Sequence, residues 1–210
     1  MFKFKKSKIF LSSLAIGITV FASSAYAQSV VYTVKPGDSM WKIASKYQVG
    51  VSELIAANPS IKNPNVIYPN QKITIPTIDD VKAFEKEVVR LTNVERAKYG
   101  LKPLTENWEL SRVARFKSQD MIDKKYFDHT SPTYGSPFTM MKNFGIKYTV
   151  AGENIAYGQK TPQEVVNAWM NSPGHRANIL NTNYTQIGVG FAKNSSGTPY
   201  WTQMFINPGK

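Results

Sequence analysis

The chain has 210 residues, of which 42% are hydrophobic and 19% charged, as is typical of a globular protein with a packed core. It contains no cysteine, which excludes disulfides, thiol catalysis, cysteine-ligated zinc and iron–sulfur centres. The formal net charge of +12 favours partners that carry phosphate or carboxylate groups. Because the basic residues are scattered along the chain, a merely solvated basic surface stays open as the alternative.

Residues 1–27 have the pattern of a secretory signal. Four lysines precede an apolar run at 9–21, and the small-residue site Ala25-Tyr26-Ala27 follows. This predicts cleavage after Ala27, with an uncleaved anchor as the alternative. The run is short for a membrane span, so we expect no transmembrane segment in the mature chain. Cleavage lowers the charge from +12 to +8, and outside the cell we expect wall polymers rather than nucleic acid as partners.

Residues 30–76 predict a small module of two strands and two helices. A β-branched run at 30–34 predicts the first strand, and the alternating run at 72–76 predicts a returning strand. Between them, Asp38 or Ser39 is expected to cap one helix and Ser52 a second. The order strand, helix, helix, strand leaves this module little core of its own.

Three blocks of this module, at 32–44, 54–59 and 67–76, resemble a LysM domain over its whole length. The resemblance implies binding to peptidoglycan or another N-acetylglucosamine-containing glycan, in a groove between two loops. Backbone amides and an apolar platform for the acetyl group suit such a ligand. A structural role in turns and core is compatible with glycan binding. The residues implied are Gly37, Asp38, Ser39, Met40, Asn58, Pro59, Ile67 and Tyr68.

Residues 82–207, after a linker at 77–81, predict an α+β domain. Thr77 and Asp80 are expected to form a capping pair for a helix that Gly100 ends. A second helix is predicted over about 105–126, with three polar side chains turned outward and a short helix after it. Those three side chains are Lys117, Asp120 and Lys124.

The last part of the chain predicts one more helix and a hairpin. Thr161 is expected to cap a helix that runs to Met170 and that Pro173-Gly174 breaks. The runs at 186–191 and 199–206 predict two antiparallel strands. Helices before and after these strands favour a layered α+β domain.

The only two histidines, His129 and His175, lie in this domain on either side of Glu153, which follows Gly152 in what we expect to be a polar loop. Two imidazoles and a carboxylate can form a polar cleft, a metal site or an acid/base pair. We expect the three to converge on one solvent-filled cleft. They match a three-ligand zinc site in type, although their spacing matches no local ligand motif. A purely structural role for His175 or Glu153 also stays open.

Five blocks of this domain resemble a CAP (SCP-like) domain: 91–96, 127–132, 152–156, 169–180 and 184–191. The resemblance implies an α–β–α sandwich with a cleft that is lined by two histidines and two glutamates and sometimes holds a divalent metal. His129 and Glu153 match one of each. Ser172 stands where the second glutamate is expected and Asn183 where the other histidine is expected, although His175 can enter the cleft from the other side. Signal, LysM and CAP together resemble secreted bacterial proteins of the YkwD type.

Two hypotheses of function stay open. In the first, the protein is secreted, associates with the cell wall in a wall-related or sporulation role, binds peptidoglycan through LysM, and presents a CAP cleft to a ligand or protein partner. In the second, it is a wall-localised peptidase or peptidoglycan hydrolase that uses the same cleft. No nucleophile motif frames Ser131, Ser172 or Thr130, which favours the first. No cofactor is required, and a divalent metal such as zinc is the one that His129, His175 and Glu153 can hold.

Overall fold

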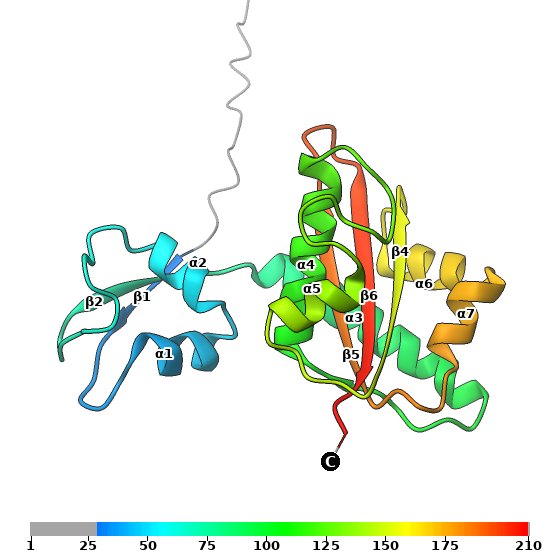
Figure 1. Cartoon of the computed structure of the whole chain (residues 1–210), viewed down its shortest axis with the longest axis horizontal. Coiled ribbons are helices and arrows are strands. Elements are labelled where there is room, and N and C mark those ends of the chain that lie inside the picture. The colour runs from blue at the N-terminus through cyan, green and yellow to red at the C-terminus, as the bar shows by residue number, and fades with distance from the viewer. Residues whose placement is uncertain (1–28, 210) are drawn as a thin grey trace, which may run out of the picture.

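The computed structural model describes residues 29–209, and the chain folds into a small N-terminal module followed by a larger sandwich (Figure 1). The signal sequence predicted at 1–27 lies outside the described residues. Within 29–209, no helix is both long and apolar enough to cross a membrane.

The N-terminal module has the predicted order of two strands and two helices. Strands β1 and β2 pair antiparallel, with Tyr32 opposite Ile73. Ser39 caps the first helix by accepting a hydrogen bond from the Lys42 amide. The prediction that Ser52 caps the second helix is wrong, because Gly50 holds the cap position and offers no side-chain bond. The elements are β1 (Ser29–Thr33), α1 (Met40–Tyr47), α2 (Val51–Ala56) and β2 (Lys72–Pro76).

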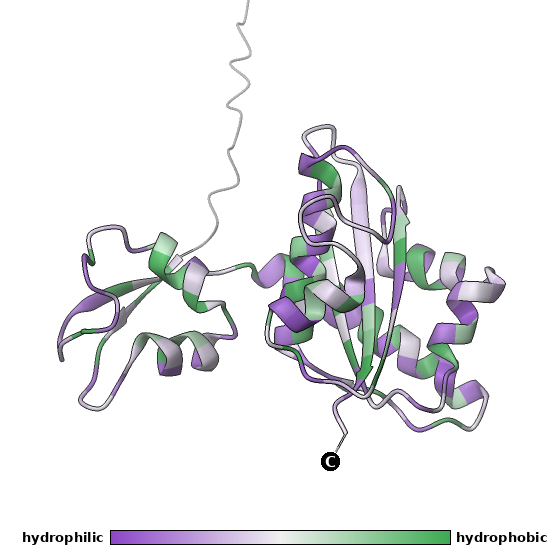
Figure 2. Ribbon diagram, in the orientation of Figure 1, coloured by the Kyte–Doolittle hydropathy of each residue, from purple (hydrophilic) through white to green (hydrophobic). Residues whose placement is uncertain are grey.

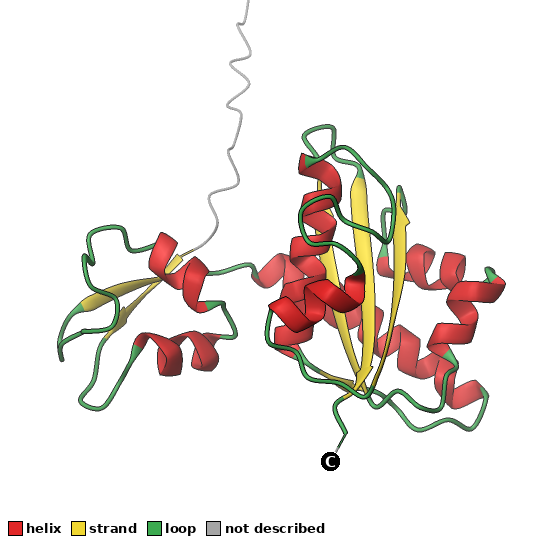
Figure 3. Cartoon of the chain, in the orientation of Figure 1, coloured by secondary structure: helices red, strands yellow, loops and turns green. Residues whose placement is uncertain are grey.

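The larger unit is a four-stranded sheet with helices on both faces (Figures 1 and 3). The strand order is β3-β5-β6-β4, and only the β3–β5 pair is parallel. This confirms the α+β class and the α–β–α sandwich that the resemblance implied. The elements are α3 (Asp79–Lys98), β3 (Thr105–Glu106), α4 (Trp108–Asp123), α5 (Pro137–Asn143), β4 (Val150–Tyr157), α6 (Pro162–Met170), α7 (Pro173–Ile179), β5 (Gln186–Lys193) and β6 (Pro199–Asn207).

Each face of the sheet has its own core, because neighbouring residues of a strand point to opposite faces. On β6, Trp201 and Phe205 pack with α3 and α6, whereas Met204 and Ile206 pack with α4 and α5. Figure 2 shows hydrophobic residues on the strands and, interleaved with hydrophilic ones, along the covering helices. The central strands are therefore buried on both sides.

Two predicted helix starts in this unit are wrong. Helix α3 begins after Ile78 with no side-chain cap, and Thr77 Oγ1 is buried without a hydrogen-bond partner among the described residues, so Thr77 and Asp80 form no capping pair. Helix α4 begins at Trp108, because Asn107 caps it by accepting from the Leu110 amide. The preceding Thr105–Glu106 pairs with β5 instead of extending the helix.

Helix α4 lies directly on strand β5 because two glycines face it. A Cβ added at Gly190 would overlap the backbone of Ala114 and Arg115, and one added at Gly188 would overlap the backbone of Leu110 and Ser111. Backbone atoms of a helix cannot move aside as the end of a flexible side chain can. The close approach of α4 to the sheet therefore depends on the missing side chains.

We expect Gly190→Ala to lower the free energy of unfolding by about 2–3 kcal/mol, because the added methyl group must push α4 off the sheet. Urea unfolding of both proteins measures this difference. Gly174→Ala in α7 is the matched control, since a Cβ there meets nothing within 4 Å and the residue is helical. Equal stability of the Gly190 variant and the control would contradict the tight α4–β5 contact.

Glu85 of α3 is a buried acid that links both faces of the sandwich. Its carboxylate lies 2.6 Å from Arg115 Nη1 on α4 and accepts a hydrogen bond from the Phe191 amide on β5. Burial raises the pKa of Glu85 to about 7, although Arg115 and the Phe191 amide oppose the shift. The interior therefore favours the protonated acid more than water does.

This shift predicts that stability falls between about pH 4.5 and pH 7. In that range the folded protein holds a proton on Glu85 that the unfolded chain has lost, so raising the pH favours unfolding. The contribution of Glu85 is full below about pH 4.5 and is lost as the pH passes 7, with a size of about 3 kcal/mol. Urea unfolding at pH 5 and pH 7.5 measures the free energy of unfolding at each pH. Its drop from pH 5 to pH 7.5 should be smaller for Glu85→Gln than for the original chain. Identical drops would show that Glu85 titrates normally.

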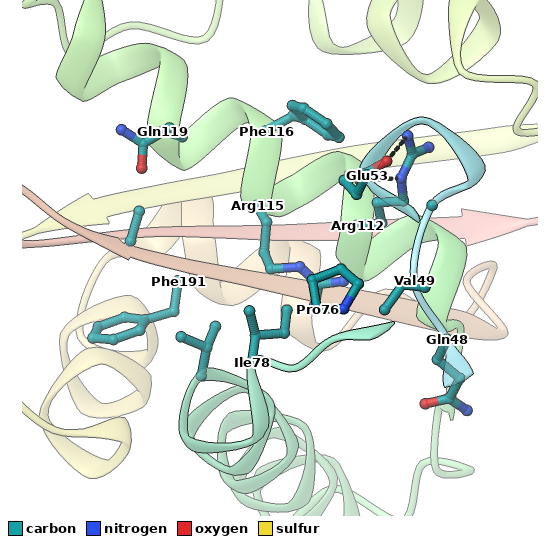
Figure 4. Close-up of a pocket in the computed structure, with 13 residues that line it drawn as sticks. Gln48, Val49, Glu53, Pro76, Ile78, Arg112, Arg115, Phe116, Gln119 and Phe191 are labelled. Carbon is teal, nitrogen blue, oxygen red and sulfur yellow. Dashed lines mark hydrogen bonds and ion pairs between the residues drawn. The ribbon is translucent and has the colours of Figure 1, made fainter. Parts of the chain in front are cut away.

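The two units meet at an ion pair between α2 and α4. Arg112 Nε lies 2.6 Å from Glu53 Oε1, and its guanidinium also donates to the Ser52 hydroxyl. The same guanidinium lies 5.1 Å from the centre of the Phe116 ring. Beside the pair is a hollow of about 410 Å³ whose walls come from both units, as Figure 4 shows with Gln48 and Val49 opposite Phe116 and Gln119.

Candidate functional site

Glu153 lies in strand β4 at the edge of the sheet, so the prediction of a polar loop is wrong. Strand β6 pairs with one side of β4, and side-chain donors from the α6–α7 region cover three carbonyls of the strand. These bonds supply partners that an edge strand otherwise lacks, and they fix the position of Glu153 along the sheet. They run from Tyr184 to Ala151, from Asn178 to Glu153 and from Trp169 to Ile155, at 3.1–3.3 Å.

His129 and Glu153 form a hydrogen-bonded pair. His129 Nδ1 lies 2.8 Å from Glu153 Oε1. The glutamate side chain is 1% exposed whereas the imidazole is 53% exposed, so the pair joins the interior to solvent. Glu153 Oε2 is buried and accepts no hydrogen bond from the described residues. The contact leaves Nε2 as the ring nitrogen that does not engage Glu153.

Both members of this pair hold their protons more tightly than usual. The hydrogen bond to Glu153 raises the pKa of His129, although burial opposes it. Burial raises the pKa of Glu153, although His129 and Lys117 oppose that shift. The two shifts act in the same direction, so the pair retains a shared proton between Nδ1 and Oε1 to higher pH than separate groups would.

Lys117 is fully buried on α4, and the prediction that it points outward is wrong. Its ammonium donates to the carbonyl oxygens of Asp128 and His129, each at 2.7 Å, and to the Tyr126 hydroxyl. Burial lowers the pKa of Lys117, and the nearby charge of Glu153 opposes that shift. All three donors of the ammonium are used, and two of them hold the backbone of the His129 loop.

Asp120, one turn along α4, is also buried rather than turned outward. Its carboxylate accepts hydrogen bonds from the hydroxyls of Tyr126, Ser131 and Thr133, at 2.6–2.7 Å. Lys117 and Asp120 therefore tie one face of α4 to the loop on both sides of His129. Lys124, the third of these predicted outward residues, is exposed.

His175 lies in helix α7 and is half-buried. Its carbonyl oxygen accepts a hydrogen bond from Asn154, which places α7 beside β4. Burial lowers the pKa of His175, and the neighbouring His129 lowers it further. The structure thus brings His129 and Glu153 into contact and places His175 near His129 without a side-chain bond between them among the described residues.

The arrangement of these side chains does not fit a metal ion as it stands. Among residues 29–209, no three His, Cys, Asp or Glu side chains are grouped so that they could hold one. Nδ1 of His129 and Oε1 of Glu153 face each other, so neither of these two atoms is free to bind a metal. Nε2 of His129 does not engage Glu153, so a metal bound there would have Glu153 as a hydrogen-bond partner of the ring and not as a ligand through Oε1.

The residues predicted to bind glycan divide into exposed and buried groups. Tyr68 is 67% exposed, and Gly37 and Pro59 also lie at the surface. Met40 is buried in the module's core. The Asn58 side chain is buried and bonded to the backbone of Leu54 and Thr74. Asp38 accepts from the Tyr32 hydroxyl and the Lys35 amide, Ser39 caps α1, and Ile67 packs on the core.

Lys117 and Asp120 are the residues of the site that sequence reasoning missed. The signal for Lys117 was present: it falls on the apolar stripe of α4, four residues after Val113 and four before Met121, both of which are buried. A lysine in that stripe must find internal acceptors or leave the core. No comparable signal identified the loop that supplies those acceptors.

The sandwich and the His–Glu pair define a class of protein. The chain matches the cysteine-rich secretory protein (CAP) family over residues 89–205, and a LysM domain over residues 32–76. The first match covers more than half of the chain, so the chain belongs to the CAP family, although it has no cysteine. The N-terminal module of the chain is a LysM domain.

Named relatives agree with this assignment. The chain is 68% identical over 126 residues to the uncharacterized protein YkwD of Bacillus subtilis. The aligned region covers 60% of this chain and 48% of YkwD. It is 37% identical over 147 residues to the uncharacterized membrane protein YlbC of the same organism, covering 67% of this chain and 41% of YlbC. The chain therefore spans about half the length of these relatives or less.

Two solved structures share the fold. An extracellular protein containing a SCP domain from Bacillus anthracis superimposes with a TM-score of 0.57 at 32% identity, over 66% of this chain and 47% of that one. An outer surface protein of Borrelia burgdorferi superimposes with a TM-score of 0.53 at 26% identity, over 63% of this chain and 96% of that one.

We expect Lys117→Met to lower the free energy of unfolding by about 3 kcal/mol, because it leaves the Asp128 and His129 carbonyl groups without their donor and removes the cation near Glu153. Chemical denaturation measures the loss. Lys124→Met is the control: it removes an exposed lysine at the end of the same helix, and we expect a change within about 0.5 kcal/mol. A Lys117 variant as stable as the control would show that the ammonium does not hold the loop.

Proposed function

We propose that this protein is exported and associates with the cell wall, where its LysM domain binds peptidoglycan and its CAP domain presents a polar cleft to a ligand or partner. The proposed organisation is a signal peptide at 1–27, LysM at 30–76, a linker at 77–81 and the CAP domain at 82–207. The LysM and CAP matches and the extracellular relative support this proposal.

One observation carries the proposed role of the CAP cleft. A buried carboxylate, Glu153, is bonded to an imidazole that reaches solvent, and Lys117 holds the backbone beside it. Such a pair offers a fixed polar group, His129 Nε2, at a position that hydrogen bonds hold from two sides. Preorganised groups of this kind bind polar ligands with little loss of conformational entropy.

We expect the purified protein to sediment with insoluble peptidoglycan, and Tyr68→Ala to weaken that binding about tenfold. Tyr68 is 67% exposed in the predicted glycan groove, and it offers a flat apolar face to a sugar. The measurement is the free fraction over a titration of wall material. Val31→Ala removes an exposed apolar side chain from β1, outside both groove loops, and should bind as the original does. Failure of the original chain to sediment would refute the LysM part of the proposal.

Hydrolysis is the second candidate, and the His129–Glu153 bond is the observation that favours it. A carboxylate that bonds Nδ1 orients the ring so that Nε2 can accept a proton from water. Ser131 Oγ, one of the candidate nucleophiles, donates its hydrogen bond to Asp120 and not to His129, so we propose an activated water as the nucleophile.

Release of soluble fragments from purified wall, or cleavage of generic peptides, tests the second candidate with and without a chelator. Turnover that is lost in both His129→Ala and Glu153→Gln would establish hydrolysis. If the original chain binds wall material but shows no turnover, the result would contradict hydrolysis and support the non-enzymatic function.

A further inference from the structure

A groove lined by aromatic side chains lies beside the His129 loop, at the end of the sheet beyond helix α4. Its volume is about 470 Å³, within the range of small-ligand sites. This aromatic groove is formed chiefly by Lys125, Tyr126, Phe127, Tyr157, Asn194 and Tyr200.

Three aromatic rings contact one another in the aromatic groove. Tyr157 and Tyr200 stand opposite each other on β4 and β6, with ring centres 5.8 Å apart and planes only 26° from parallel. Phe127 meets Tyr157 edge to face, with ring centres 4.7 Å apart. Tyr157 is 53% exposed and Phe127 44% exposed, so large apolar faces are open to solvent. Exposed aromatic clusters of this kind commonly mark a binding surface.

The aromatic groove and the His129–Glu153 pair share two segments of the chain. Phe127 precedes His129 by two residues on the loop, and Tyr157 follows Glu153 by four residues on β4, which puts both strand residues on the same face of the sheet. The same two segments therefore make two side-chain contacts in succession, first Phe127 with Tyr157 and then His129 with Glu153.

Lys125 borders the aromatic groove in a conformation that is unusual for lysine. Its φ of 56° is in the left-handed region, which glycine adopts without strain. This residue follows the end of α4, where the chain turns so that Tyr126 bonds the buried Asp120 and Phe127 reaches the surface. Lys125 therefore places a cation beside the rings, although glycine would be less strained at this position. Among the residues that line the groove, none is acidic.

We propose that the aromatic groove binds a peptidoglycan strand, with sugar rings on Phe127, Tyr157 and Tyr200 and a carboxylate of a stem peptide at Lys125; this rests on the proposed function of the LysM domain. The C–H faces of pyranose rings pack on aromatic faces, while Lys125, Asn194 and Ser195 supply donors at the rim. A LysM domain on the same chain would raise the local concentration of the same polymer, so a weak second site suffices.

Residue-resolved NMR on the full chain separates the two sites. One probe is a soluble disaccharide-peptide strand released from the wall by a muramidase; the other is tetra-N-acetylchitotetraose, which has no carboxylate. We expect both probes to shift signals of Tyr157 and Tyr200 as well as those of the LysM loops. Tyr157→Leu should weaken binding at the aromatic groove about tenfold for both probes, and Tyr157→Phe should retain it, because only the flat ring is required.

Lys125→Gly is the sharper variant, because it relieves the left-handed strain and so should fold at least as well. We expect it to weaken binding of the disaccharide-peptide strand about fivefold at the aromatic groove and to leave tetra-N-acetylchitotetraose unaffected.

Shifts confined to the LysM loops would overturn the inference and leave the proposed function intact, whereas no shift anywhere would overturn both. Full binding by Tyr157→Leu would show that the groove recognises apolar surface in general, as a protein partner would, and would also overturn the inference.

Discussion

The structure around the candidate site depends on giving each buried ionisable side chain a hydrogen-bond partner. Glu153 from β4 and Lys117 from α4 are both removed from water, and neither forms a direct ion pair with the other. Glu153 is bonded to His129, whereas Lys117 is bonded to the backbone that carries His129. An unpartnered charge in this interior would cost several kcal/mol, so the loop that supplies hydrogen-bond partners to both side chains has little freedom to adopt another path.

On the edge of β4 that faces away from β6, neutral side chains supply the hydrogen-bond partners of the strand. An edge strand has unpaired carbonyl groups, and here donors from Trp169, Asn178 and Tyr184 take the place of a further strand. Helices α6 and α7 are therefore attached to the same strand that presents Glu153 to the other face. Each face of the sandwich constrains the His129–Glu153 pair: one through strand β4 and the other through the His129 loop.

We consider three potential binding surfaces on this chain. Tyr68 in the LysM loops, the His129 side chain and Tyr157 in the aromatic groove are all open to solvent. Where the two domains meet, Arg112 is bonded to Glu53 and Ser52. Weak sites on one chain that meet the same polymer reinforce one another without any single tight contact, provided that the polymer can reach them together. The described residues of this basic, cysteine-free chain pack into three hydrophobic cores, one in the LysM domain and one on each face of the CAP sheet.

The sequence by itself determined the two-domain order, the antiparallel hairpin of β5 and β6, and helix starts such as Thr161, because these follow from local periodicity and capping. Only the tertiary structure decided where the polar residues of the site lie. Glu153, between Gly152 and Asn154, has no local preference for a strand, and it joins one because pairing with Met204 of β6 outweighs propensity. Lys117 is buried because a loop about ten residues further along the chain returns with acceptors for its ammonium, and no local pattern records that distant contact.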